Sequence, residues 1–311
     1  MTRADPAPER CAVCLAASRW EWASPRLRVA FCPGCGHRTA DHRIHGPPDS
    51  DYHDQYEQGA FVEALAATRR RQARRILSLV RAETPGARRL LDFGCGRGWL
   101  LEEAARAGFD RVAGADASRR AVTGLRDRGL EAVLVPAGEP DRFDAAQLSF
   151  RPQVLTLLDV VEHFAPERAG RILAGLLASL GPEVEVVVVK VPDSGGLLYR
   201  IASVAARVGA RGALEQLYQV GTSPPHRSYF SRRSLQALLA GAGLEGRAVL
   251  GDRDFEPRLL RDRVATLQRT PRAVGALAGW TLAACAGALD MHDALVCLAR
   301  VRRDTAAGGA T

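Results

Sequence analysis

Short apolar runs alternate with stretches of mixed polarity through most of the chain after residue 87. The runs are rich in Leu, Ala and Val, which is typical of strands covered on both faces of a sheet. The alternation of strand and helix predicts an α/β fold with a doubly wound, mostly parallel sheet and right-handed crossovers. The predicted strands are 90–93, 110–116, 131–135, 154–158, 185–192, 245–250 and 294–301.

Helices are predicted on either side of several of these strands. Apolar positions within 61–83 fit a helix that Pro85 and Gly86 end. A loop and helix are predicted over 194–220. Ser231 can cap a further helix that starts at the next residue and ends near residue 241.

The pattern divides the chain into parts with different characters. The expected parts are a small N-terminal module (1–45), a linker and helix leading into the main domain (46–86), the main domain (87–303) and a flexible tail (304–311). Within the main domain, 251–292 predicts a helical insertion near the C-terminus. Its uncharged run 273–289 falls short of the about 20 residues that span a membrane. We therefore expect no transmembrane segment and a helix packed on the domain, with peripheral membrane contact as the alternative.

The composition permits a sizeable core and raises the question of whether the chain binds an acidic partner or nucleic acid. The 311 residues are 47% apolar and carry a net charge of +8. That charge could attract an acidic partner, and the arginine run at 69–75 could grip phosphates. The arginines are scattered, however, and Lys190 is the only lysine. We therefore favour a solvated helix face over nucleic acid binding.

Four of the seven cysteines stand in two close pairs near the N-terminus. Cys11 and Cys14 form one Cys-x-x-Cys pair, and Cys32 and Cys35 form the other. This spacing predicts a zinc ribbon in which four thiolates hold one structural Zn²⁺. A redox-active Cys-x-x-Cys is the alternative.

Residues around the cysteine pairs support a small folded module. The apolar residues between the pairs alternate as in a small hairpin. Three histidines follow closely, and since four cysteines already complete a closed site, we expect them on the surface. These histidines are His37, His42 and His45.

The remaining three cysteines indicate whether the protein belongs in a reducing or an oxidising cellular compartment. Cys95, Cys285 and Cys297 lie in apolar surroundings and are typical of buried thiols. Reduced cysteines and the lack of an apolar leader near residue 1 predict a cytoplasmic protein.

The candidate chemistry centres on residues 90–98. Two apolar residues and Asp92 precede Gly94, Gly96 and Gly98, and a helix pattern follows. Glycines at a strand-to-helix turn let a ligand approach the backbone and the helix N-terminus. Trp99 stands where a dinucleotide fingerprint needs its third glycine, so a ligand without pyrophosphate fits better.

The acid and alternating glycines resemble motif I of the Rossmann-like (class I) S-adenosylmethionine-dependent methyltransferases. The resemblance implies that the three glycines line the methionine end of that cofactor, and Asp92 is assigned to cofactor binding with them. Asp116 ends the second strand about 20 residues later, where such folds place a carboxylate for ribose hydroxyls. A helix cap is the alternative explanation of Asp116, with Ser118 as the rival cap. The stretch 154–164 resembles the family's fourth strand and the turn after it, and Asp159 is assigned to the cofactor on that basis.

Two histidines are the candidates for activating an acceptor. His163 follows the fourth strand, and His226 belongs to an H-x-x-x-F-S element that recurs in the family. A neutral imidazole can take the proton of an acceptor near pH 7. Each histidine could equally be structural, and Tyr229 is a weaker third candidate. The segment 194–231 mixes apolar bulk with glycines and is predicted to form a lid over the acceptor.

The acceptor itself is predicted only as a class. The chain resembles sugar C-methyltransferases with an N-terminal four-cysteine module and ribosomal RNA methyltransferases with a zinc ribbon. We favour a small-molecule, sugar or lipid-linked acceptor. The alternatives are an RNA methyltransferase and a non-catalytic zinc-ribbon interaction protein on a cofactor-binding fold.

Overall fold

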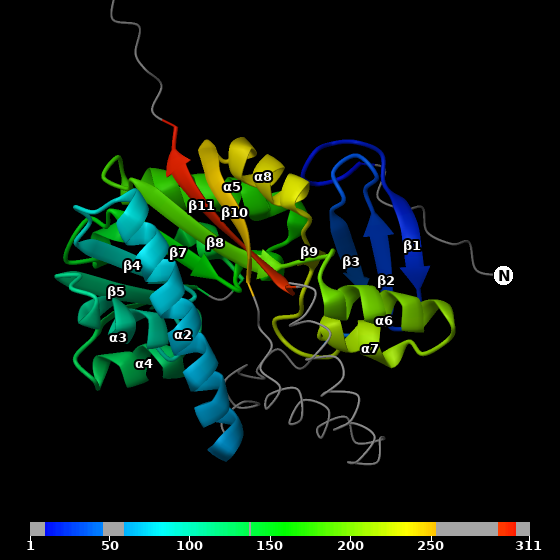
Figure 1. The fold of residues 1–311 in the computed structure, drawn as a ribbon, viewed down its shortest axis with the longest axis horizontal. Helices are drawn as coiled ribbons and strands as arrows, with labels where there is room; N and C mark the ends of the chain where they lie inside the picture. The colour runs from blue at the N-terminus through cyan, green and yellow to red at the C-terminus, as the bar shows by residue number, and fades with distance from the viewer. Residues whose placement is uncertain (1–9, 46–58, 137, 253–291, 303–311) are drawn as a thin grey trace, which may run out of the picture.

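The computed structural model describes residues 10–45, 59–136, 138–252 and 292–302, and its largest element is a seven-stranded sheet (Figure 1). In order across the sheet the strands are β10 (Leu244–Asp252), β11 (Ala294–Val301), β8 (Val186–Pro192), β7 (Val154–Leu158), β4 (Arg89–Phe93), β5 (Arg111–Asp116) and β6 (Glu131–Leu134). The five strands from β8 to β6 pair in parallel, and β11 and β10 continue antiparallel. The predicted strands and mostly parallel sheet are confirmed.

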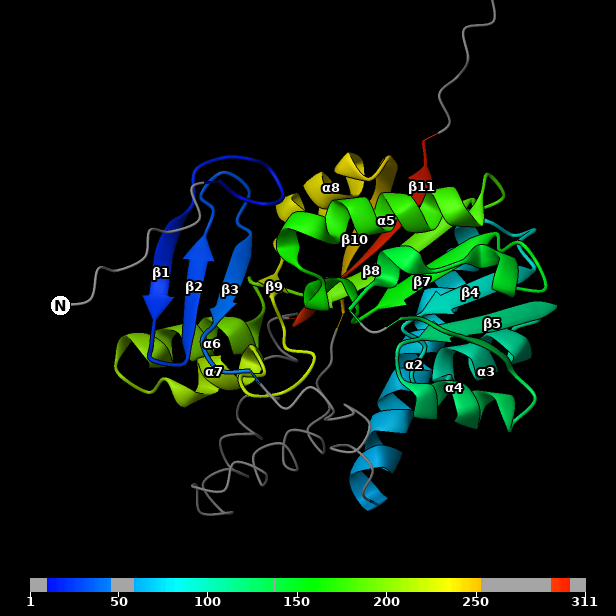
Figure 2. The same cartoon turned by 180° about the vertical axis from the view of Figure 1, so that it is seen from behind.

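Helices cover both faces of this sheet, as Figures 1 and 2 show from opposite sides. One face carries α2 (Gly59–Glu83), α3 (Trp99–Arg106) and α4 (Arg119–Arg126), and the other carries α5 (Pro166–Leu180) and α8 (Arg232–Gly241). Alternation along a strand sends neighbouring side chains to opposite faces. Leu90 therefore packs in the core under α2 and α3, whereas Leu91 packs in the core under α5 and α8.

Strand order fixes where ligands can reach the sheet. The chain moves outward from β4 through β5 to β6, then crosses back to β7 on the other side of β4. Parallel strands end at one edge, and the crevice at such a reversal is where open α/β sheets bind ligands. The turns that follow β4 and β7 meet at this edge. The described part of the chain also contains three short 3-10 turns: η1 (Pro140–Arg142), η2 (Ala145–Gln147) and η3 (Val161–His163).

A second, four-stranded sheet lies beside the first (Figure 2). It consists of β1 (Arg19–Ala23), β2 (Leu27–Phe31), β3 (Arg38–His42) and β9 (Ser228–Tyr229). The hairpin expected between the cysteine pairs is confirmed by β1 and β2. The sequence did not predict β9, which pairs with β3 from nearly 190 residues further along the chain.

Two helices join this small sheet to the rest of the molecule. The segment 194–231, predicted as a lid, forms α6 (Leu197–Arg207), α7 (Gly212–Leu217) and β9. Tyr199 and Tyr218 lie buried with Leu27 and Val29 of β2. These apolar side chains fill an interior between α6, α7 and the sheet. A closing movement of the segment over an acceptor stays a prediction.

The expectation that the histidines after the second cysteine pair lie on the surface is wrong for two of them. His37 is 2% exposed and His42 is 8% exposed, while His45 is exposed. The His37 ring lies 4.8 Å from the Phe230 ring, centroid to centroid. Burial lowers the pKa of His37 to about 3, so its ring is neutral at pH 7. Contact with the main domain buries these side chains, and sequence spacing could not reveal that contact.

The helical insertion predicted for 251–292 lies mostly outside the described residues, since its first two residues end β10 and 253–291 are not described. The predicted tail 304–311 also lies outside them. None of the described helices is both long and apolar enough to cross a membrane.

Candidate functional site

Three glycines shape the turn between β4 and α3. Gly94, Gly96 and Gly98 have φ angles of 79°, 50° and 77°, a region that side-chain-bearing residues rarely adopt. A Cβ added to Gly94 would lie 2.2 Å from Cγ2 of Val160, and one added to Gly98 would lie 2.3 Å from Cδ2 of Leu125. Packing therefore requires glycine at both positions. Gly98 is the N-cap of α3, so the unpaired N–H groups of that helix face the carboxyl edge of the sheet.

Asp116 ties this turn to the end of β5. Its carboxylate accepts hydrogen bonds from the backbone N–H groups of Gly96 and Ser118, each at 2.8 Å. The hydroxyl of Ser118 caps α4 by accepting from the N–H of Ala121. The cap of α4 is therefore Ser118, not Asp116. A carboxylate has about four lone-pair sites, so Asp116 can also accept hydrogen bonds from a ligand hydroxyl.

Asp92 lies buried at the carboxyl end of β4. It is 4% exposed, and its Oδ1 accepts a hydrogen bond of 2.6 Å from the Thr156 hydroxyl of β7. Burial raises the pKa of Asp92 to about 7, and the nearby charge of Asp116 acts in the same direction. The carboxyl group can therefore gain or lose a proton near neutral pH without leaving its place.

Asp159 follows β7 and has a left-handed backbone, with φ of 58°. Lys190 of β8, which is 1% exposed, places its Nζ 2.8 and 2.9 Å from the two carboxylate oxygens. Arg69 of α2 also pairs with this carboxylate. The sequence singled out Asp159 but missed both of its cationic partners. A cofactor contact by Asp159 stays a prediction.

Glu162, His163 and His226 form a cluster beyond the end of β7. The first two belong to η3, and His226 comes from the segment before β9. The Nε2 of His226 lies 4.0 Å from Oε1 of Glu162, and the two imidazole rings lie 4.9 Å apart, centroid to centroid. Burial raises the pKa of Glu162 well above its ordinary value, and the charge of Asp159 adds to this. Burial also lowers the pKa of His163, which keeps that ring neutral at pH 7.

The backbone of residues 225–231 is held on several sides. The Nε2–H of His42 donates to the carbonyl of His226 at 2.8 Å. Further hydrogen bonds run from His163 Nδ1 to the Pro225 carbonyl, from Arg227 N–H to the Glu162 carbonyl, from Ala40 N–H to the Arg227 carbonyl, from Phe230 N–H to the Pro192 carbonyl and from the Ser231 hydroxyl to the Cys35 carbonyl. The N-terminal sheet, η3 and the end of β8 thus position His226 together.

Tyr229, the third candidate for activating an acceptor, lies in a different environment. It is 5% exposed, and its hydroxyl donates to the Leu217 carbonyl at 3.0 Å. Its ring lies 4.6 Å from that of Tyr199 and 4.9 Å from that of Tyr218, centroid to centroid. Tyr229 therefore belongs to the aromatic interior under α6 and α7.

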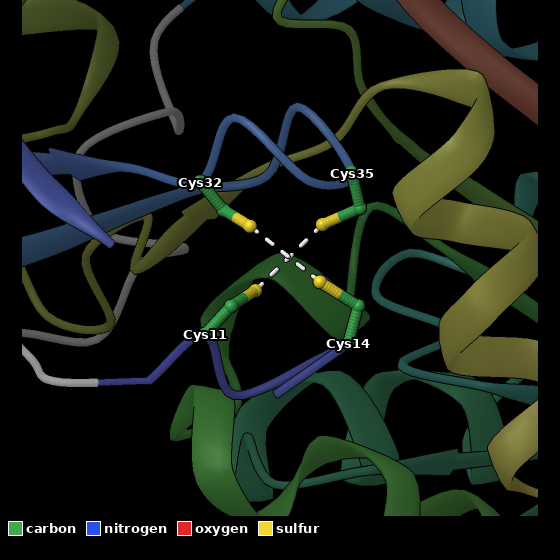
Figure 3. Close-up of side chains that lie close together, drawn as sticks. All are labelled: Cys11, Cys14, Cys32 and Cys35. Carbon is green, nitrogen blue, oxygen red and sulfur yellow. Dashed lines mark hydrogen bonds between the residues drawn. The ribbon is translucent and has the colours of Figure 1, made fainter. Parts of the chain in front are cut away.

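The four N-terminal cysteines turn their sulfurs toward a common centre (Figure 3). The Sγ atoms of Cys11 and Cys35 lie 3.7 Å apart, and those of Cys14 and Cys32 lie 3.5 Å apart. Four thiolates around one Zn²⁺ at about 2.3 Å lie about 3.8 Å from one another. The donor set and its spacing therefore fit a tetrahedral zinc ion. A Cβ added to Gly34 would lie 2.8 Å from Cβ of Ala16, so the turn between Cys32 and Cys35 has no room for a side chain at position 34.

The arginine run in α2 is engaged within the chain. Among the described residues, the ion pairs of this run join Arg69 to Asp159, Arg70 to Glu102 and Glu103, Arg74 to Glu103, and Arg75 to Asp252. These contacts fix α2 against α3 and the sheet. Intramolecular pairing explains the run without a phosphate ligand.

The sequence marks both histidines of the cluster as candidates but gives no role to Glu162 or His42. The Glu-His pair after the fourth strand was visible in the sequence, and it was the signal for Glu162. For His42 there was no signal, because its contact with the His226 carbonyl spans 184 residues.

Comparisons with known proteins identify the family of the main domain. A family model described as a methyltransferase domain matches residues 65–249. The 1,6-didemethyltoxoflavin-N1-methyltransferase of Burkholderia thailandensis, solved with 1,6-didemethyltoxoflavin and S-adenosylhomocysteine, is 18% identical, with a TM-score of 0.51 over 91% of this chain and 99% of that one. Magnesium protoporphyrin IX methyltransferase of Synechocystis PCC 6803 is 16% identical, with a TM-score of 0.47 over 79% of this chain and 89% of that one. A search of curated proteins gives no match.

Proposed function

Because this chain belongs to the class I S-adenosylmethionine-dependent methyltransferases, we propose that it methylates a small-molecule, sugar or lipid-linked acceptor at the carboxyl edge of its sheet. One observation carries the proposal. The glycine turn after β4 packs directly on the turn after β7, where Gly94 leaves no room for a side chain beside Val160. The cofactor turn and the cluster of Glu162, His163 and His226 are therefore neighbours.

The cofactor would lie along the first of these turns. Gly94, Gly96 and Gly98 would let its methionine end approach the backbone, with Asp92 beneath them at the end of β4. Asp116 would accept hydrogen bonds from the ribose hydroxyls, as carboxylates at this position do in related folds. The hydrogen bonds of Asp116 to Gly96 and Ser118 hold its carboxylate ready for this role.

The acceptor would lie on the other side of the cofactor's sulfur, against the cluster. When bound, S-adenosylmethionine supplies an electrophilic methyl group for a displacement at carbon, and alignment of the reacting atoms is the main contribution of the protein. His226 and His163 are the proposed catalytic groups. A neutral imidazole here can take the proton that a hydroxyl acceptor loses as its oxygen attacks.

The N-terminal module would serve this site as a zinc-stabilised support. Cys11, Cys14, Cys32 and Cys35 would hold one structural Zn²⁺, since four thiolates close a tetrahedral site and leave no position for a substrate. So small a module has little core of its own, and metal binding supplies folding free energy directly. The module then holds the segment 225–231 through β3 and the Cys35 carbonyl.

Two measurements test the proposal in sequence. Calorimetry with S-adenosylmethionine and S-adenosylhomocysteine should show binding to the full chain. Release of S-adenosylhomocysteine should then follow from incubation with a panel of small hydroxylated acceptors, nucleotide sugars and lipid-linked sugars. An absence of cofactor binding would favour a non-catalytic interaction protein, and labelling of RNA alone would favour the RNA methyltransferase.

A further inference from the structure

The cluster beyond β7 has the composition of a metal site. Glu162, His163 and His226 each place one donor atom so that all three lie within 4.8 Å of one another. Two ligands of one divalent ion at about 2.1 Å each lie roughly 3 to 3.5 Å apart. Side-chain rotations that bring the donor atoms closer by up to about 1.3–1.8 Å would therefore place all three around a single ion.

The hydrogen bond of His163 prepares one ring nitrogen for this role. Its Nδ1 donates to the carbonyl of Pro225 at 2.9 Å, because a carbonyl can only accept. The remaining nitrogen, Nε2, therefore carries the lone pair. Metal-binding histidines are oriented in this way, with the other ring N–H donated to a carbonyl or carboxylate.

Glu162 supplies an independent sign of a missing partner. Its side chain is 1% exposed, and its Oε2 has no hydrogen-bond partner among the described residues. The Nε2 atom of His226 lies 4.0 Å from the other oxygen, Oε1, which is too far for a hydrogen bond. Buried polar atoms are rarely left without a partner. A cation between the carboxylate and the two imidazoles would satisfy this one.

We propose that Glu162, His163 and His226 bind one divalent transition-metal ion, at a second site distinct from the four cysteines. Two imidazoles and one carboxylate suit ions such as Mn²⁺, Fe²⁺ or Zn²⁺, whereas an all-thiolate site selects soft-ligand ions. The ion compensates the carboxylate charge that burial otherwise disfavours. With the ion bound, the two imidazoles are metal ligands in place of the base role in the proposed function, and the ion lowers the pKa of a bound acceptor hydroxyl so that its proton can pass to water.

The site also narrows the acceptor class, and this step rests on the proposed function. Three protein ligands leave up to three positions open on a six-coordinate ion. An acceptor with two adjacent oxygens, such as a vicinal diol, a catechol or a hydroxy-carbonyl group, could fill two of them. Chelation would fix the oxygen that receives the methyl group relative to the cofactor turn.

Titration with Mn²⁺ tests the metal site without cofactor or acceptor. The zinc-loaded full chain is titrated while the six-line electron paramagnetic resonance signal of free Mn²⁺ is recorded. We expect about one bound Mn²⁺ per chain, because Mn²⁺ prefers carboxylate and imidazole ligands to the thiolates of the first site. Glu162→Gln and His226→Gln should each weaken binding at least about tenfold, the smallest loss expected even for an outer-shell change.

His45→Gln is the matched control, since His45 is an exposed histidine outside the cluster and should leave the titration unchanged. Calorimetry with S-adenosylhomocysteine checks that the cluster variants stay folded. The proposal is overturned if the wild-type chain binds neither Mn²⁺ nor Zn²⁺ beyond its thiolate-bound ion. It is equally overturned if both cluster variants bind Mn²⁺ as the wild type does. Neither result bears on cofactor binding, so failure of the metal site and failure of the methyltransferase proposal are separate outcomes.

Discussion

The two halves of the candidate site are built in different ways. Apart from Asp159, the proposed cofactor side comes from one continuous stretch, residues 92–118, in which the end of β4, the glycine turn, α3 and β5 follow one another. The acceptor side is assembled from three distant stretches, 36–42, 159–163 and 225–231. A ligand site made of consecutive residues can be recognised as a motif. A site made of distant residues depends on every contact that holds its parts together.

The two halves also differ in what supports them. Backbone hydrogen bonds to Ala115 and the carboxylate of Asp116 hold the cofactor turn within the main domain. The segment with His226 is held partly by the N-terminal sheet, through β3 and the carbonyl of Cys35. Changes in the N-terminal module should therefore disturb the acceptor side and spare the cofactor side.

Removal of the four-cysteine metal site should give the largest effect. In the double variant Cys32→Ser, Cys35→Ser, elemental analysis should show one zinc ion fewer per chain. Structural zinc contributes on the order of 10–16 kcal/mol in small zinc-binding peptides, so the module should lose its fold. Methyl transfer should collapse, while S-adenosylhomocysteine affinity, by calorimetry, should change by less than about 0.5 kcal/mol, as expected for independent sites.

The control for this variant is Cys297→Ala, which removes a buried thiol of the main sheet and should keep all bound zinc. Undiminished zinc in the double variant would contradict the zinc proposal. A parallel loss of cofactor affinity would show that the two halves are not independent.

Substitution of His226 should give the next largest effect. The His226→Ala variant should lower turnover by about 10²–10⁴, the usual cost of losing an acid–base group, and leave cofactor affinity nearly unchanged. His45→Ala, an exposed histidine, is the control and should behave as the wild type. Calorimetry measures the cofactor affinity of each variant, and a turnover assay measures its rate of methyl transfer. Surviving turnover would make His226 structural and His163 the better candidate.

Substitution of Asp116 should weaken cofactor binding, whereas substitution of His226 should lower turnover and spare cofactor binding. Asp116→Ala should weaken S-adenosylmethionine binding by about 1.5–3 kcal/mol, the range for hydrogen bonds to a charged group. Ser118→Ala is the matched control. It removes the cap of α4, at a cost of about 0.5–2 kcal/mol in stability, without touching the proposed ribose contact. Equal cofactor affinity in the folded Asp116→Ala variant and the wild type, by calorimetry, would refute the ribose assignment.

Because of Asp92, the free energy of unfolding should depend on pH, by at most about 1.4 kcal/mol per pH unit. Burial raises its pKa from 3.8 in the unfolded chain to about 7 in the native protein. Between these values the native state holds a proton that the unfolded state has released. The free energy of unfolding should therefore fall as pH rises from about 4 to about 7, and the contribution is lost above that range.

Urea denaturation over this pH range measures the effect. Asp92→Asn cannot ionise, so the stability of wild type relative to this variant should decline with rising pH. Asp110→Asn, at an exposed position, should show no such trend relative to wild type. A wild-type advantage over Asp92→Asn that grows toward pH 7 would mean that Asp92 is stabilised in its ionised form.

Most of the main fold followed from local pattern. The strand 294–301 and the helix 232–241 with its Ser231 cap agree with the structure to the residue. Their signals are local, because side-chain periodicity and a capping hydroxyl act over a few residues. The shape of the glycine turn could be predicted for the same reason: Gly94 and Gly98 adopt the left-handed backbone that an alternating glycine turn predicts.

The acceptor side could be named only in part. The sequence marks His163 and His226 singly, but nothing in it predicts that their rings lie 4.9 Å apart, centroid to centroid, or that the buried Glu162 lies beside them. The apolar residues of 194–231 are predicted to shield an acceptor, and the sequence does not reveal that several of them also form an interior against β2. Apolar composition predicts that side chains are buried, without predicting against which surface.

The sequence by itself determined the elements that rest on nearest neighbours: the alternating strands and helices, the glycine turn with its acid, and the cysteine pairs with the spacing of a zinc ribbon. Tertiary structure alone decided that β9 completes the N-terminal sheet, that His42 supports the backbone of His226, and that Glu162, His163 and His226 meet. The physical reason is the distance along the sequence over which each kind of interaction acts. Backbone dihedrals and helix caps are set within a turn of chain, whereas strand pairing and burial join residues whose separation in sequence carries no pattern.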